Sequence, residues 1–516
     1  MDSTSIQPSQ DPVGSFADSK SAPSWADPLR LRRRVIRGGS FLIVTRIGTQ
    51  VLSWAGTLFV ARLLRPYDYG VMTTGMIFIA LADVLAEAGV SRALVQKERL
   101  EPRDLAEGFT LSLILSVALC ALLIAVAPSA GAFLDDPDLP ALLRLLALSL
   151  ILTPFRAIPM ALLERNLELR RQSAAYALSL LFPLCLVLGL AVRGYGFWAL
   201  AGGTLATRAL EAVMLPYLAG WRPQIVKPGR HARELLKFGV HVSLGALLWF
   251  AYSNADYAVV SKVIGPAALG YYALAFQLIS LPVQKLTGNV NQAVYPLYCR
   301  LQHDRDRLRD WYLRVTALLS LLGMPVLAGM AIVADDAFAL LLGEKWLPAV
   351  VPFQVLAFVG MLMTVSYSLS PLINALGRPD INLRYTIIST IILPSGFVIL
   401  GLTHGLVGIC WAWLILYPLI DVWIVHSTRH LTGCSVKDLA VAQLPVVMGV
   451  IAMAVTTLMA KKLLADVSPA VLRLGATIAV GAATYTGFML LVARRTVVAD
   501  LRMLLRELRR DEPEPT

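Results

Sequence analysis

Long apolar stretches run through almost the whole chain and decide what it can fold into. The 516 residues are 57% hydrophobic and 16% charged. A membrane-spanning helix needs about 20 apolar residues, and such stretches lie near 40–61, 70–90, 109–127, 141–162, 174–192, 197–218, 238–260, 268–290, 313–334, 349–375, 383–402, 405–427, 439–460 and 471–493. Inside a bilayer each backbone polar group must be bonded within the protein. The sequence therefore predicts an all-α polytopic membrane protein with about fourteen transmembrane helices.

Two of these regions look like copies of one unit. Residues 39–80 and 239–280 match in register, and both contain the pattern apolar-apolar-x-Pro-x-x-x-Gly. Pro66 and Gly70 in the first copy become Pro266 and Gly270 in the second. Transporters commonly bind their substrate between two related halves. We therefore expect two related six-helix lobes followed by two further helices.

The apolar stretches and the charged segments between them also suggest domain boundaries. The N-terminal residues are rich in Ser, Pro and Asp and lack an apolar signal segment, so they should form a disordered tail rather than a cleaved leader. The last residues combine leucines on one helical face with arginines elsewhere, as in helices that lie on a membrane surface. Six parts are predicted: a basic cytoplasmic tail (1–37), a first lobe (38–221), a cytoplasmic linker (222–237), a second lobe (238–430), two additional transmembrane helices (431–494) and a cytoplasmic amphipathic tail (495–516).

The basic residues indicate the orientation in the membrane. A net charge of +12 could suggest a nucleic-acid partner. However, Lys and Arg concentrate in alternate loops, which is the bias of cytoplasmic loops. We therefore expect a multi-pass protein of the bacterial inner membrane with both termini in the cytoplasm.

Several function classes find no support in the sequence. The outer loops are short, which leaves no room for a polymerase or glycosyltransferase domain, and no Gly-x4-Gly-Lys-Ser/Thr motif is present. The five cysteines lack metal-ligand spacing, and the histidines are widely separated. The sequence therefore predicts a transporter that is not an enzyme and needs no metal or cofactor.

Ionisable residues inside the predicted spans are candidate site residues, because a charge near the bilayer centre costs about 2.5–3.5 kcal/mol or more. They are Arg46, Asp83, Glu87, Arg156, Arg208, Glu211, Asp256, Lys285 and Asp421. If Arg46, Arg208 and Lys285 converge, they form a cationic surface suited to a pyrophosphate. Alternatively, Arg46 and Lys285 extend to the membrane interface, and Arg208 only pairs with Glu211 at i, i+3.

The remaining candidates are acidic or neutral. Asp83 and Glu87 lie one helical turn apart, so they share a face where a carboxylate could bind a proton or sodium ion. Alternatively, the pair lies at the cytoplasmic end of the span beside Arg92. Asp256 is a candidate for ion coupling or gating. Asn291 and Gln292 could contact sugar, although hydrogen bonding at a helix end explains them equally well.

A family resemblance rests on an ordered set of motifs between about residues 35 and 430. Its elements are 61–70, 256–278, Leu281-Pro282, Tyr295-Pro296, 342–346 and 374–380. Together they resemble the polysaccharide transporter (Wzx-type flippase) family of the multidrug/oligosaccharidyl-lipid/polysaccharide exporter superfamily.

The resemblance implies a flippase that moves undecaprenyl-pyrophosphate-linked oligosaccharide units across the inner membrane by alternating access. Exopolysaccharide, capsule or lipopolysaccharide synthesis would then use the product, with a polysaccharide polymerase and chain-length machinery as expected partners. The alternative is a cation-coupled multidrug exporter of the same superfamily. That function would favour an acidic lumen with fewer unpaired arginines, whereas the sequence favours a cationic one.

Overall fold

The computed structural model describes residues 48, 52, 54–87, 89–97, 100–166 and 168–492. All regular elements in these residues are helices. The predicted tails (1–37 and 495–516) and Arg46 lie outside the described residues.

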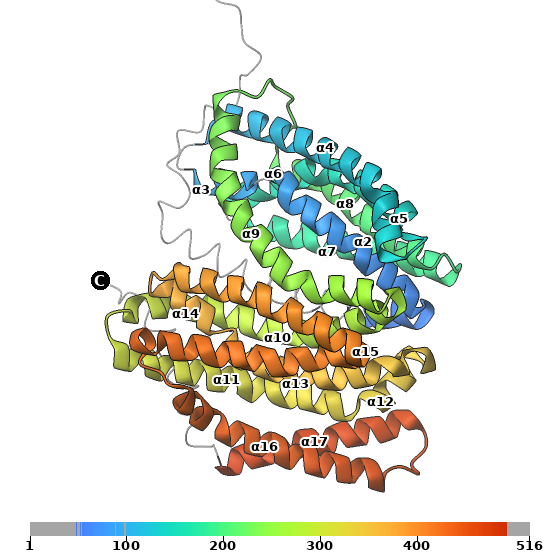
Figure 1. Cartoon of the computed structure of the whole chain (residues 1–516), viewed down its shortest axis with the longest axis vertical. Helices are drawn as coiled ribbons and strands as arrows, with labels where there is room; N and C mark the ends of the chain where they lie inside the picture. The colour runs from blue at the N-terminus through green and yellow to red at the C-terminus, as the bar shows by residue number, and fades with distance from the viewer. Residues whose placement is uncertain are drawn as a thin grey trace, which may run out of the picture.

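The first half of the described chain folds into one bundle (Figure 1). Proline at the first helical position and a capping box at Glu101 and Asp104 fix where two of its helices begin. The Asp68 carboxylate accepts from the backbone N–H groups of Arg65 and Phe197, at 2.8 and 3.1 Å, so it joins the starts of two helices. The helices are α2 (Pro66–Glu87), α3 (Val90–Gln96), α4 (Pro102–Leu134), α5 (Leu139–Ala147), the 3₁₀ turn η2 (Leu148–Leu152), α6 (Thr153–Arg165), α7 (Leu169–Val192) and α8 (Phe197–Ala219).

The second half forms another bundle, and a terminal pair packs beside it (Figure 1). Its helices are α9 (Arg230–Val263), α10 (Pro266–Leu301), α11 (Arg305–Ile332), α12 (Ala334–Ala337), the short turns η3 (Phe338–Leu342) and η4 (Glu344–Ala349), α13 (Val350–Ser366), α14 (Leu369–Ala375) and α15 (Pro379–Thr432). The terminal pair is α16 (Val436–Leu463) and α17 (Ala470–Val492). We call the two bundles the N-lobe (α2–α8) and the C-lobe (α9–α15).

Ten helical stretches of the described chain are long and apolar enough to cross a membrane. One of them, α15, has 54 residues and would be about 80 Å long if straight. Instead it folds back at Gly405, whose φ of 61° and ψ of −143° suit glycine alone. This break lies between the predicted spans 383–402 and 405–427. The predicted all-α polytopic fold is confirmed, and the count of fourteen helices stays a prediction.

The duplicated motif forms the crossing between the two lobes. Gly70 of α2 lies against α10, and Gly270 of α10 lies against α2. A Cβ at Gly70 would lie 1.7 Å from the Pro266 carbonyl oxygen. A Cβ at Gly270 would lie 1.8 Å from the carbonyl oxygen of Pro66. The two copies therefore pack reciprocally, and only glycine lets their backbones approach this closely.

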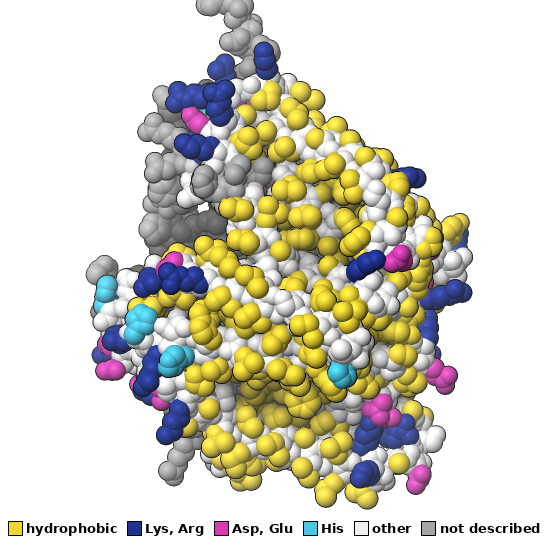
Figure 2. All heavy atoms as spheres, viewed as in Figure 1, with side chains coloured by type: hydrophobic (Ala, Val, Ile, Leu, Met, Phe, Trp, Pro, Cys, Tyr) yellow, Lys and Arg dark blue, Asp and Glu magenta, His cyan; other side chains and the backbone are white. Residues whose placement is uncertain are grey.

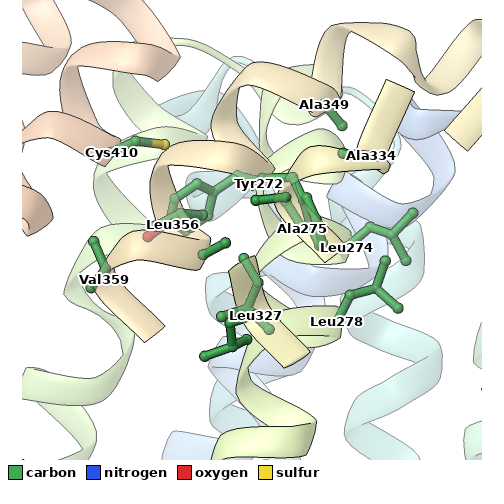
Figure 3. Packing of buried hydrophobic residues seen from close by; sticks show 14 of the residues in the cluster. Tyr272, Leu274, Ala275, Leu278, Leu327, Ala334, Ala349, Leu356, Val359 and Cys410 are labelled. Carbon is green, nitrogen blue, oxygen red and sulfur yellow. The ribbon is translucent and has the colours of Figure 1, made fainter. Parts of the chain in front are cut away.

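A continuous apolar core extends from this crossing into the C-lobe. Tyr272, Leu274 and Ala275 of α10 are fully buried against residues of α11 and α13 (Figure 3). The fully buried Trp346 donates its indole N–H to the Ala61 carbonyl at 2.8 Å and packs edge-on against Tyr69. The core therefore includes contacts between the two lobes near the crossing of α2 and α10.

Candidate functional site

An ion pair between α2 and α8 lies inside the N-lobe. Both guanidinium Nη atoms of Arg208 contact the Asp83 carboxylate, at 3.0 and 2.5 Å. Thr153 of α6 donates its hydroxyl to the same carboxylate at 2.9 Å. The two charged side chains are only 12% and 17% exposed, so this fork-like pair is held away from solvent.

A second arginine extends this ion pair into a network. Arg156 of α6 lies 3.6 Å from the Glu87 carboxylate and 3.8 Å from that of Glu211. The network therefore contains three carboxylates and two guanidinium groups. Because each arginine already faces a carboxylate, the network offers no excess positive charge to a ligand.

The sequence correctly grouped part of this network. Asp83 and Glu87 do share a face of α2, and both face basic side chains. The pairing of Arg208 with Glu211 was wrong, since Glu211 faces Arg156 and Arg208 reaches across to α2. Thr153 was missed, and its only signal is a hydroxyl among apolar residues, which is common in membrane helices.

Lys285 lies on a polar face of α10 beyond the crossing with α2. The exposed residues on this face include Gln284, Lys285, Asn289 and Gln292. Within the part of the chain that the structure describes, Lys285 has no ion-pair partner. Exposed polar side chains on a helix apolar enough to span a membrane fit either a polar cavity or the membrane interface, so substrate binding by Lys285 stays a prediction. We call these four residues the α10 polar face.

The two predicted glycan contacts differ in their surroundings. Asn291 is partly buried, and its side-chain amide donates to the Tyr367 carbonyl at 3.0 Å. Its Oδ1 is buried with no hydrogen-bond partner among the described residues. Gln292 is exposed on the α10 polar face. Whether either residue binds glycan stays a prediction.

Asp256 lies inside the C-lobe rather than on an open surface. The residue is about 1% exposed. Its carboxylate accepts hydrogen bonds from the Tyr272 hydroxyl at 2.6 Å and from the backbone N–H of Tyr257 at 2.9 Å. Trp413 in turn donates to the Tyr272 hydroxyl at 2.8 Å. No basic side chain pairs with Asp256 in the described chain. Ion coupling or gating by Asp256 stays a prediction.

Asp421 of α15 was noted in the sequence but given no role. It accepts hydrogen bonds from the hydroxyl groups of Ser366 and Tyr385, the second at 3.2 Å. Like Asp256, it has no basic partner among the described side chains. The C-lobe therefore contains two carboxylates that accept hydrogen bonds from hydroxyl groups.

Further contacts join the lobes at the end where α2 and α10 begin. Arg62 donates to the Leu340 carbonyl at 3.2 Å, and Lys345 donates back to the Arg62 carbonyl at 2.7 Å. Lys262, the counterpart of Arg62 in the repeat, pairs with Asp135 at 3.0 Å. The hydroxyl groups of Thr74 and Ser261 are 3.0 Å apart. These contacts join the lobes at the end that the charge pattern predicts to be extracytoplasmic. At the opposite end, the Glu107 carboxylate of α4 accepts from the backbone N–H groups of Gly229 and Ala232 at the start of α9, both at 2.8 Å, so the lobes also touch there.

No metal centre is evident in the described residues, since no three His, Cys, Asp or Glu side chains are grouped to hold an ion. All five cysteines are free thiols.

Two solved structures share this fold. The structure is similar to that of the lipid II flippase MurJ in an inward closed conformation, with a TM-score of 0.73, 14% identity, and coverage of 89% of this chain and 99% of the other. It is also similar to an inward-facing multidrug resistance MATE family transporter, with a TM-score of 0.57, 18% identity, and coverage of 74% and 94%. At these identities the likeness shows the fold.

Two relatives in sequence are named for polysaccharide biosynthesis. The lipopolysaccharide biosynthesis protein WzxC of Escherichia coli is 24% identical over 396 residues, which cover 75% of this chain and 79% of the relative. The succinoglycan biosynthesis transport protein ExoT of Rhizobium meliloti is 22% identical over 469 residues, which cover 90% and 94%. The polysaccharide biosynthesis protein family matches residues 59–351. Because this match covers more than half of the sequence, the chain belongs to the polysaccharide biosynthesis protein family.

Proposed function

We propose that this protein flips polyprenyl-pyrophosphate-linked oligosaccharide units across the bacterial inner membrane by alternating access. The observation that carries the proposal is the α10 polar face, where a lysine with no ion-pair partner among the described residues and three amide side chains lie on a helix long and apolar enough to span a membrane. A substrate with an anionic pyrophosphate and a hydroxyl-rich glycan needs such groups in that place. The relatives named for lipopolysaccharide and succinoglycan biosynthesis support the same substrate class.

In this mechanism different side chains bind different parts of the substrate. Lys285 makes the first contact with the pyrophosphate, because its ammonium group is not neutralised by a described carboxylate. Arg208 joins it when Asp83 releases the guanidinium group, and Arg46 adds a further contact. Asn291 and Gln292 bind the glycan, and the lipid tail stays in the bilayer.

The lobe contacts support alternating access. The two lobes are fastened where Arg62, Lys345 and Trp346 meet, and α2 and α10 cross at the paired glycines. Rocking about this crossing would open one end of the protein while the other closes. Both termini would then face the cytoplasm, where lipid-linked units are made.

A multidrug exporter coupled to a cation is the second candidate. The acidic side chains favour it, because the N-lobe network has more carboxylates than guanidinium groups and Asp256 has no basic partner in the described chain. Asp83, Glu87 and Asp256 would then bind the coupling ion. The same residues could also couple an ion to flipping, so the two candidates differ in the substrate.

Deleting the gene tests the substrate. We expect lipid-linked repeat units to accumulate in the inner membrane while polysaccharide at the cell surface disappears. Unchanged levels of both, together with lower resistance to amphipathic drugs, would contradict the flippase and favour the exporter.

Substituting Lys285 tests the proposed pyrophosphate contact. Lys285→Ala should lower the export of surface polysaccharide about ten-fold or more, because a charge-assisted contact to phosphate is lost. Lys285→Arg should retain most export, since it keeps the charge. Lys462→Ala, an exposed lysine at the end of α16, is the matched control. Full export by Lys285→Ala in membranes that contain normal amounts of the protein would contradict this role.

A further inference from the structure

A cavity lined by basic side chains lies at one end of the C-lobe, away from the crossing of the lobes. It has a volume of about 520 Å³ and is lined by Arg305, His426, Arg429, His430 and Gly433. No acidic residue lines it, and all four basic residues are exposed. Figure 2 shows histidine and basic side chains gathered at the left-hand ends of the C-lobe helices.

Two helix ends build this cavity. Gly433 ends α15 with a φ of 68°, and its N–H bonds the Arg429 carbonyl at 2.9 Å. The turn brings the last residues of α15 beside the start of α11, where Arg305 donates to the His430 carbonyl. His426, Arg429 and His430 share one face of α15, because they are three or four residues apart.

Neighbouring acidic residues do not neutralise the cavity. Asp438 pairs with Arg309 at 2.8 Å, and Asp304 pairs with Arg307 at 3.3 Å. Among the described residues, Arg429 and Arg305 have no carboxylate within ion-pair distance. The cavity therefore keeps its positive charge and suits an anionic group.

An apolar stripe runs along α15 directly from this cavity. Its residues are exposed to between 41% and 62% although they are large and hydrophobic: Trp411, Ile415, Leu419, Val422 and Trp423. They recur at three- or four-residue intervals and continue in register to His426 and Arg429. Tryptophan near the end of the stripe is typical of the boundary between acyl chains and headgroups.

We propose that this surface binds an anionic phospholipid of the inner leaflet, with its phosphate in the basic cavity and its acyl chains along the apolar stripe of α15. The charge and the apolar length match the two parts of such a lipid. Neither the cavity nor the stripe includes a residue of the α10 polar face. The surface would therefore tie the activity of the protein to the lipid composition of the membrane, whatever substrate is moved.

Native mass spectrometry of the full chain in detergent tests the proposal. We expect phosphatidylglycerol to be retained at least about ten-fold more tightly than phosphatidylcholine with the same acyl chains. Arg305→Gln/Arg429→Gln should lose this preference, whereas the control Arg103→Gln/Arg222→Gln, which removes two exposed arginines elsewhere on the predicted cytoplasmic side, should keep it. Equal loss in both variants, or equal binding of both lipids, would overturn the proposal.

A single substitution and a competition experiment complete the test. Arg305 bonds the His430 carbonyl, so its loss could unfold this corner of the protein. Arg429→Glu leaves that bond in place and should by itself abolish the preference for phosphatidylglycerol, whereas Arg222→Glu should not. Inorganic phosphate at millimolar concentration should fail to displace phosphatidylglycerol. Displacement would overturn the lipid assignment and indicate a site for soluble phosphate.

Discussion

At the scale of single residues, Asp83 and Arg208 depend on each other. Asp83→Ala leaves the guanidinium group without its carboxylate in a site only 12% exposed, and such broken pairs cost about 3 kcal/mol or more. The double variant Asp83→Leu/Arg208→Met should recover most of the lost stability, because an apolar pair can replace a buried ion pair. Thermal unfolding of the purified variants in detergent measures both effects.

Export of polysaccharide by the same double variant tests whether Arg208 only holds α8 against α2. If Arg208 binds pyrophosphate, the stable double variant should fail to export. A double variant that unfolds like the wild type and exports normally would show that Arg208 only holds α8 against α2.

Charges inside the spans could be predicted from the sequence, but their partners could not. Asp83, Glu87 and Arg208 lie within apolar stretches, so the sequence predicted that they are in the membrane. Because a charge is costly there, it also predicted that they face away from lipid. Arg208 lies one turn from Glu211, which favoured a pair within α8. The packing of α2, α6 and α8 decides otherwise, because it brings Asp83 and Thr153 to Arg208 from two other helices.

At the scale of helices, the crossing of α2 and α10 has no room for a side chain at Gly70. Gly70→Ala would place its Cβ 1.7 Å from the Pro266 carbonyl oxygen, so the helices must separate. Overpacking costs about 1–3 kcal/mol and occasionally more, and this clash is with backbone atoms that cannot move alone. We expect a large fall in the thermal unfolding midpoint, and a similar fall for Gly270→Ala because the contact is reciprocal.

Gly475→Ala is the control for this clash. Gly475 lies within α17, and nothing is near enough to contact an added Cβ. Alanine should therefore raise helix stability slightly. Equal unfolding midpoints for Gly70→Ala and Gly475→Ala would contradict the close crossing.

The sequence predicted the duplicated helices but not their contact. Proline and glycine in register predicted that α2 and α10 are copies, because such residues rarely match by chance in apolar stretches. Nothing in one copy indicates that it packs against the other, since that depends on how the two lobes dock. The fold class therefore followed from the sequence, whereas the arrangement of the lobes required the structure.

At the scale of the whole molecule, the proposed transport cycle requires the lobes to separate where they are now joined. Thr74 of α2 and Ser261 of α9 are both buried, and their hydroxyl oxygens are 3.0 Å apart. Cysteines at these positions should form a disulfide that locks the lobes together. The exposed Cys185 and the partly buried Cys299 would first be replaced by serine, to prevent other disulfides.

We expect Thr74→Cys/Ser261→Cys to stop flipping of lipid-linked units in vesicles under oxidising conditions and to resume it after reduction. Each single cysteine variant should flip normally under both conditions, which controls for the substitutions. The reasoning is that alternating access cannot proceed when one end stays closed. Gel mobility after partial proteolysis reports how much of the protein is cross-linked. Normal flipping by fully cross-linked protein would mean that the substrate crosses without separation of α2 and α9, and alternating access between these lobes would be wrong.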